Sequence, residues 1–427
     1  MTREAAAPRR RLGGLLIDVT PLRVSRHYRL LFAALSASLL VYGVLAVAIA
    51  WQAFAMTGSS LQVGLVGFCG AAAMATGSLA GGVLADRHDR RRLMLGGRSA
   101  FLCNVLVLFF NATLQTPSLG VLYAAAATGG LIGGITAPAL MATVPSLLGR
   151  EHLAHAGALA AMVAQIGGVA GPSIAGFLIA GPGLAFCYAV VAAGTALTPV
   201  LLFFLPDLPP RGASPGKGFS AIAQGWRHLR SNPIVSGLLL VDLAAFLFAV
   251  PFALMPQIGT QIPGGGPETV SLLYMAPASG AFIAALSSGW TGRTRHAGRV
   301  LVTMVIVWGA SIALAGALGG RHPMLFLFAL SGYCATIAEI LRGALLQHHT
   351  PDALRGRVSS LWLVQSTIGP AIGGVQMGAV ASLFSPSVAL LCGGAICVAA
   401  AALVSIRRPA LREARLIYEG PQVQPAR

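Results

Sequence analysis

The chain has 427 residues, of which 56% are hydrophobic and only 10% charged, and its mean hydropathy is +0.77. A soluble protein carries about a quarter charged residues, so this composition excludes an ordinary soluble fold. The formal net charge of +17 would suggest a nucleic-acid partner in a soluble protein, but here the basic residues form short clusters between apolar segments. We therefore expect a lipid bilayer around the chain and no nucleic acid.

Twelve apolar segments follow one another, each long enough to cross a bilayer as a helix. The sequence predicts an all-α membrane protein whose twelve transmembrane helices form two six-helix halves, 30–205 and 233–406. An N-terminal arm (1–29), a central linker (206–232) and a C-terminal tail (407–427) flank the halves and are expected to be cytosolic. The predicted helices are 30–54, 62–85, 93–113, 118–147, 155–180, 184–205, 233–257, 269–290, 299–319, 323–349, 359–382 and 386–406.

The distribution of basic residues predicts the orientation. Arginine and lysine gather in both tails and in every second loop, whereas the alternate loops carry only Arg321. Cytosolic loops are enriched in such residues, so both termini are expected in the cytosol of a multi-pass protein of the cytoplasmic (inner) membrane. Pro145 and Gly82 recur 206 or 207 residues further on as Pro351 and Gly289, which indicates two tandem repeats.

The loop after the second segment reads GVLADRHDRRR from Gly82 to Arg92. It resembles the loop motif of the major facilitator superfamily, G-x-L-a-D-r-x-G-r-k, with Asp89 in place of the usual glycine. The resemblance implies alternating access, and we expect a gate formed by Gly82, Asp86, Arg87 and Arg90. An acid at a helix end can bind an arginine or the N-terminus of a neighbouring helix. Arg91 and Arg92 are interpreted as orientation signals only.

The fifth segment reads GGVAGPSIAG from Gly167 to Gly176. This resembles the antiporter motif of the same superfamily, g-x-x-x-G-P-x-x-G-G, which accompanies exporters there. Its candidate residues are Gly167, Gly171, Pro172 and Gly176. The alternative is generic close packing of small residues. The basic residue common in the fourth helix of drug–proton antiporters is absent from 123–134, which weakens an assignment to that subgroup.

A closer resemblance covers nearly the whole chain. The stretches VLADR from Val83, SLLGREHL from Ser146 and TPDALRGRVSSLW from Thr350 are similar to the enterobactin exporter family. That resemblance implies proton-coupled export of a small, siderophore-like amphipathic molecule, with protons as a second partner and a monomer as the expected state. The alternatives are a broad multidrug/proton antiporter and, more distantly, a channel, a receptor or a membrane-embedded enzyme. Since no catalytic or phosphate-binding motif is found, we expect no enzyme, cofactor or metal.

Charged residues within the apolar segments are costly, at about 2.5–3.5 kcal/mol each at mid-bilayer. Asp242 on the seventh segment and Glu339 with Arg342 on the tenth lie at similar depths. We expect Asp242 or Glu339 to exchange a proton and Arg342 to hold anionic cargo. The alternative is a structural pair of Glu339 and Arg342, three residues apart on one helix, with Asp242 as an incidental partner of Arg342. Phe246 and Tyr333 are candidates for stacking on an aromatic cargo, with simple packing as the alternative. A further arginine near a helix end, Arg98, is expected to extend to the membrane surface.

Overall fold

The computed structural model describes residues 19–209, 226–227 and 229–416. The arm residues 1–18, most of the central linker and the end of the tail, with the lone Lys217, lie outside the described residues. Short 3₁₀ segments cover Arg150–His152, Phe252–Leu254 and Ser288–Arg293. The helices of the first half are α1 (Thr20–Val24), α2 (Arg26–Thr57), α3 (Ser60–Arg87), α4 (Arg90–Thr113), α5 (Leu119–Leu147), α6 (Leu153–Ala180) and α7 (Leu184–Phe203). Those of the second half are α9 (Pro233–Phe248), α10 (Met255–Gln261), α11 (Pro267–Ser287), α12 (Ala297–Leu318), α13 (Arg321–His348), α14 (Asp352–Leu383), α15 (Pro386–Arg407) and α16 (Pro409–Glu413).

The predicted fold class is confirmed. Among the described residues, 11 helices or helix pairs are long and apolar enough to cross a membrane, with α9 and α10 counted as one span. The predicted segment that is left out of this count is the eleventh, 359–382, which is α14. It is less apolar because it carries four polar residues in its central part: Gln365, Ser366, Thr367 and Gln376. It packs along α3 inside the bundle, so these polar groups lie next to protein as well as lipid.

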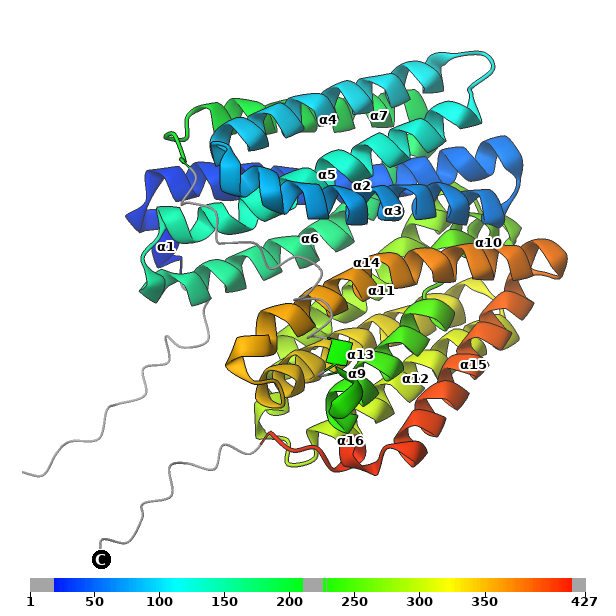
Figure 1. The fold of residues 1–427 in the computed structure, drawn as a ribbon. Helices are drawn as coiled ribbons and strands as arrows, with labels where there is room; N and C mark the ends of the chain where they lie inside the picture. The colour runs from blue at the N-terminus through cyan, green and yellow to red at the C-terminus, as the bar shows by residue number, and fades with distance from the viewer. Residues whose placement is uncertain (1–18, 210–225, 228, 417–427) are drawn as a thin grey trace, which may run out of the picture.

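The two halves pack side by side as separate helix bundles (Figure 1). They meet where α3 packs against α14 and where α6 packs against α11. In each half, the segment after the last long helix forms a backbone hydrogen bond with the start of the third long helix. These segments follow α7 and α15, and the helices that they contact are α4 and α12. The backbone N–H of Arg90 donates to the carbonyl of Leu208 at 3.0 Å, and that of Gly298 donates to Ala414 at 3.1 Å. The two contacts are related by a shift of about 207 residues, the spacing of the sequence repeats.

The seventh span is interrupted, whereas the sequence predicted one continuous helix over 233–257. Helix α9 ends at Phe248, and α10 begins only at Met255. Pro251 explains the break, because its ring clashes with the preceding helical turn and it has no N–H to donate. The indole N–H of Trp308 on α12 donates to the carbonyl of Ala249 at 3.0 Å, so this buried carbonyl keeps a partner.

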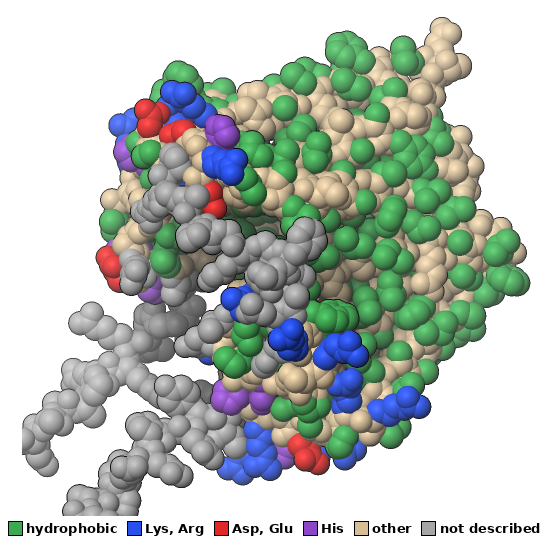
Figure 2. Space-filling model, in the orientation of Figure 1, with side chains coloured by type: hydrophobic (Ala, Val, Ile, Leu, Met, Phe, Trp, Pro, Cys, Tyr) green, Lys and Arg blue, Asp and Glu red, His purple; other side chains and the backbone are tan. Residues whose placement is uncertain are grey.

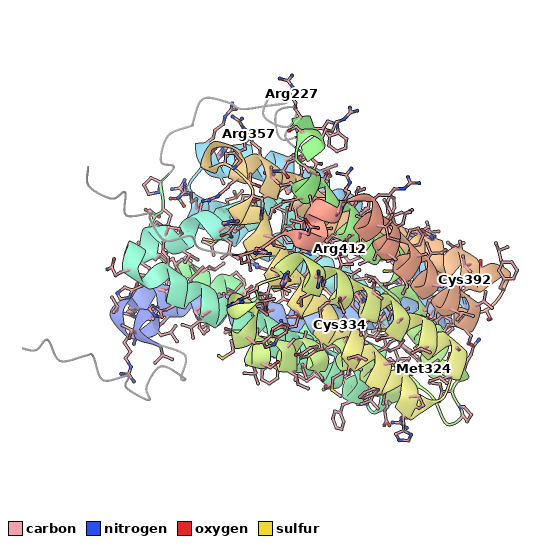
Figure 3. The ribbon with its side chains drawn as sticks, turned by 90° about the horizontal axis from the view of Figure 1, so that it is seen from below. Arg227, Met324, Cys334, Arg357, Cys392 and Arg412 are labelled. Atoms are coloured by element: carbon pink, nitrogen blue, oxygen red, sulfur yellow. The ribbon has the colours of Figure 1, made fainter. Side chains whose placement is uncertain are left out.

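Charged side chains concentrate at one end of the bundle (Figure 2). We call this the charged end; α2 and α4 begin there, and α7 and α15 end there. Arg227, Arg357 and Arg412 lie at this end, while Met324 and Cys392 lie toward the opposite, far end (Figure 3). The side of the bundle is covered with exposed apolar side chains such as Phe177 and Leu286, as expected for a surface that faces lipid.

Candidate functional site

A large cavity lies between the two halves, with a volume of about 1080 Å³. Its walls come from α2 to α7 on one side, and from the break between α9 and α10 together with α11, α13 and α14 on the other. The walls extend from Leu31 and Met94, near the charged end, to Val63 and Ala253, near the far end. They are mostly apolar, and the volume suits an organic molecule larger than a typical drug.

The far end of the cavity is closed by contacts between the halves. The hydroxyl of Ser60 on α3 donates to the side-chain oxygen of Gln257 on α10 at 2.7 Å. One turn further, α3 and α14 touch backbone to backbone, since a Cβ placed on Gly64 would lie 2.6 Å from the carbonyl oxygen of Gly374. The cavity therefore extends from this closure toward the charged end.

Beside the cavity, the second half holds a cluster of charged and aromatic side chains. The guanidinium of Arg342 donates to the carboxylate of Asp242, and both side chains are 7% exposed. The indole N–H of Trp362 on α14 donates to the other carboxylate oxygen of Asp242 at 3.0 Å. The ring of Trp362 also stacks on Arg342, with 4.6 Å between guanidinium carbon and ring centroid. Three helices, α9, α13 and α14, are thereby joined through one ion pair.

Glu339 connects this cluster to the cavity. Its carboxylate lies 3.7 Å from the guanidinium of Arg342, and its side chain is 62% exposed. Ala335 and Thr336, one turn earlier on α13, line the cavity. Residues three and four apart share a helix face, so Glu339 continues the cavity face of α13 toward the charged end. Asp242 and Arg342 lie behind that face.

The two aromatic candidates lie away from the cavity. Phe246 packs against Gly369 of α14: a Cβ added to Gly369 would lie 3.0 Å from the Cβ of Phe246. The hydroxyl of Tyr333 accepts a hydrogen bond of 3.4 Å from Ser287 on α11. Neither is among the described residues that line the cavity wall.

The loop predicted to act as a gate lies between α3 and α4 at the charged end. Asp86 and Arg87 are exposed, and Gly82 has open space beside its backbone. Arg90, in contrast, is 7% exposed and donates to the carbonyl of Ala142 on α5 at 3.3 Å. In this conformation Arg90 fastens the loop within its own half, and Asp86 is free to take a partner.

The residue that departs from the family loop motif has a structural role. Asp89 caps α4 by accepting from the backbone N–H of Arg92 at 2.9 Å, and it also accepts from Leu208 at 2.7 Å. The neighbouring Arg91 forms an ion pair of 2.9 Å with Asp207. A carboxylate at an N-cap satisfies free helical N–H groups, which a glycine cannot do.

The antiporter-like motif lies at the crossing of α6 with α2. Gly43 of α2 fits against Gly167 and Gly171, and a Cβ on Gly43 would lie 2.7 Å from the carbonyl oxygen of Gly167. Pro172 lines the cavity, while Gly176 faces Ser271 of α11 in the other half. The motif therefore touches both the cavity wall and the contact between the halves.

Two contributors to the site were missed from the sequence. Trp362 lies in the stretch from Thr350 that resembles the exporter family, but nothing in the sequence places it beside the ion pair, because it is on a different helix from both Asp242 and Arg342. Arg98 was expected to reach the membrane surface, but its guanidinium donates to the hydroxyl of Tyr42 at 2.8 Å and lines the cavity. Its spacing of three residues from Phe101, which also lines the cavity, was the available signal.

No group of three or more metal-binding side chains occurs within residues 19–209 and 226–416, apart from residue 228, which is not described. The six cysteines lie in this part of the chain and are free thiols.

Comparison with known proteins finds a family model that matches almost the whole chain. A family model described as transmembrane secretion effector matches residues 18–423. The enterobactin exporter EntS of Shigella boydii is 33% identical over 375 residues, covering 87% of this chain and 89% of the exporter. The same exporter of Escherichia coli O1:K1 is 32% identical over the same shares.

Among solved structures, the fold is similar to that of a POT family transporter in complex with 5-aminolevulinic acid. Its TM-score is 0.72 at 13% identity, with 91% of this chain and 97% of that chain covered. The nucleoside transporter NupG gives a TM-score of 0.71 at 13% identity, with shares of 89% and 98%. These structures are alike in fold.

Proposed function

The chain belongs to the transmembrane secretion effector family of the major facilitator superfamily, and on this basis we propose that it exports a small, siderophore-like amphipathic molecule. The relatives named as enterobactin exporters support this class of cargo. The cavity of about 1080 Å³, closed at the far end, carries the proposal, because a transporter loading cargo from one side needs such a space.

The charged end is the cytosolic end in this proposal. The clustered arginines there, against Arg321 near the far end, support the assignment under the positive-inside rule. Both termini are then cytosolic, the membrane is the cytoplasmic (inner) one, and the conformation described is ready to take up cargo from the cytosol. A monomer suffices, since one chain supplies the cavity and both of its ends.

Export is coupled to protons through the cluster in the second half. Glu339 is the exposed carboxylate, so it meets protons that enter from the cavity. Proton binding there removes one of the two negative charges facing Arg342 and leaves Asp242 as its sole carboxylate partner. Because Asp242 and Trp362 belong to α9 and α14, this change in charge acts on three helices that must move when the second half rocks.

The gate at the charged end acts through Asp86. Exposed in this conformation, its carboxylate is available to bind the second half once the charged end closes. Arg90 holds the loop in place through its hydrogen bond to the carbonyl of Ala142 on α5. The antiporter-like motif on α6 serves the same movement, because Gly176 lies against α11 where the halves meet.

The test is uptake of enterobactin into inside-out membrane vesicles that contain the protein. We expect saturable uptake that needs a proton gradient and stops when an uncoupler is added. Vesicles carrying Asp242→Asn with unchanged uptake and pH dependence would contradict the role of that residue.

The main alternative is a broad multidrug antiporter, and a cargo panel separates the two. Comparable uptake of several chemically unrelated cationic drugs would favour the multidrug alternative. Uptake restricted to enterobactin and similar catechol compounds would favour the siderophore-like cargo. Flux that persists without any gradient would contradict secondary active transport altogether.

A further inference from the structure

Arg98 is the single charged residue among the described residues that line the cavity. It lies eight residues into α4, which places its Cα about 12 Å from the start of that helix. An arginine at this depth is costly unless its charge is balanced. No acidic side chain is found in the described part of the cavity wall, so no protein carboxylate there pairs with Arg98, and the guanidinium is open to an anionic group that enters the cavity.

Arg342, which also lies at membrane depth, has a charge that is balanced by acidic side chains. Arg342 contacts the carboxylates of Asp242 and Glu339 and the ring of Trp362. Within the described residues, Arg98 has only the neutral hydroxyl of Tyr42 as a hydrogen-bond acceptor. Its guanidinium carbon also lies 5.5 Å from the centroid of the Tyr42 ring, a weak attraction that leaves most of its N–H groups without partners.

The surroundings of Arg98 fit one end of an amphipathic molecule. The Tyr42 ring packs against that of Phe101, with 5.0 Å between centroids, and both residues line the cavity. Beyond them the wall is mostly apolar. A guanidinium binds carboxylates and similar planar anions through paired N–H groups, and the two rings offer an apolar surface directly beside it.

We infer that Arg98 holds the anionic group of the cargo, so that the transported molecule is an amphipathic organic anion anchored in the first half of the protein. Tyr42 is a positioning residue, because its hydroxyl holds the guanidinium at the cavity wall. The inference rests on the proposed function, and it assigns recognition of the cargo and exchange of the proton to different halves. Cargo charge is recognised on α4, and proton exchange takes place on α13.

The test is equilibrium dialysis of the purified, full-length protein in detergent against two probes of one shape. 2-Naphthoate carries a negative charge, and 2-naphthamide is neutral. We expect the wild-type protein to bind the anion about tenfold more tightly, which is typical of one hydrogen-bonded ion contact. Arg98→Gln should bind both probes with similar affinity.

Two further variants keep the result unambiguous. Arg299→Gln removes an exposed arginine at the charged end and should keep the full preference. Tyr42→Phe keeps the charge of Arg98 but removes the hydroxyl that positions it, so the preference for the anion should be smaller than in the wild type and still present. A wild-type protein without preference would overturn the inference, as would an Arg98→Gln protein that retains the preference or loses affinity for both probes equally.

The dialysis experiment involves no gradient, so it separates this inference from the proposed function. A protein that prefers naphthoate through Arg98 but transports nothing in vesicles would contradict export alone. A protein that exports enterobactin normally with Arg98→Gln would contradict the anchoring role alone.

Discussion

The hydroxyl of Ser60 and the side-chain oxygen of Gln257 lie 2.7 Å apart, and this hydrogen bond joins the two halves at the far end of the cavity. The neighbouring glycines of α3 and α14 allow the backbones to touch there. Closure at this end thus depends on small residues and one polar contact, and an added side chain should open it.

Gly64→Leu should shift the protein away from the conformation described. The new side chain would meet the backbone of Gly374, and overpacking costs about 1–3 kcal/mol, enough to change a two-state ratio roughly 5- to 150-fold. Spin labels at Thr116 and Ser382, exposed residues at the far ends of the two halves, should report a longer distance. The labels require prior replacement of the exposed Cys103 and Cys392 by serine.

Gly67→Leu is the matched control for this experiment. Gly67 lies one turn along the same helix, and a Cβ there meets no atom within 4 Å. Its label distances should equal those of the wild type. Equal distances in the Gly64 variant would show that α3 and α14 do not form the closure.

Trp308→Phe should lower thermal stability. The variant leaves the carbonyl of Ala249, at the break between α9 and α10, without its donor, and an unsatisfied buried group costs about 1–3 kcal/mol. Trp290→Phe removes the indole of a tryptophan that is 39% exposed, and we expect a change below about 0.5 kcal/mol. The melting temperature of the detergent-solubilised protein measures both. A smaller loss for Trp308 than for Trp290 would contradict this role.

Asp242→Asn should be strongly destabilising, since it leaves the buried Arg342 without its main carboxylate partner. Loss of one member of a buried ion pair costs about 3–5 kcal/mol. The double variant Asp242→Asn with Arg342→Gln should recover part of that loss, because no unpaired charge remains. Thermal melting of the three proteins checks the prediction, and a double variant no more stable than the single one would refute it.

Glu339→Gln should change the coupling of transport to protons without changing the thermal stability of the protein. Its side chain is mostly exposed, so the melting temperature should change little. The variant cannot exchange a proton at this position, and enterobactin uptake into vesicles should lose its dependence on pH. Uptake measured at several pH values gives the answer; a profile identical to that of the wild type would remove Glu339 from the coupling mechanism.

Asp86→Asn should slow export by about tenfold without affecting the stability of the conformation described, where Asp86 is exposed. The loss arises when the charged end closes and a charge-assisted hydrogen bond is missing. Arg92→Gln, an exposed change in the same loop, should leave export within about twofold. Vesicle uptake rates compare the two, and equal rates would reduce the loop motif to an orientation signal.

The sequence predicted the fold well because membrane spans are specified by length and composition. An apolar segment of about twenty residues must form a helix in lipid, whatever its neighbours are. The break in the seventh span was also accessible in principle, since Pro251 and Pro256 are visible in the sequence. The segment is nevertheless apolar throughout, and apolar length alone favours one continuous helix over 233–257.

Side-chain direction was much harder to predict. These helices are apolar on all sides, so periodicity does not reveal which face points inward. The similar depths of Asp242 and Glu339 indicated that the three charges lie near one another, and the structure pairs Arg342 with both carboxylates. The directions of Phe246, Tyr333 and Arg98 depend on helix rotation, which is fixed by packing between helices, such as the contact of Phe246 with Gly369.

The docking of Leu411 has a practical meaning for shortened versions of the protein. Leu411 in α16 is fully buried, and it packs against Gly237 of α9 and Gly298 of α12. A truncation after Arg407 would therefore uncover two glycine-lined surfaces in the second half. Affinity tags and deletions should begin beyond Leu416, because the preceding residues are part of the folded bundle.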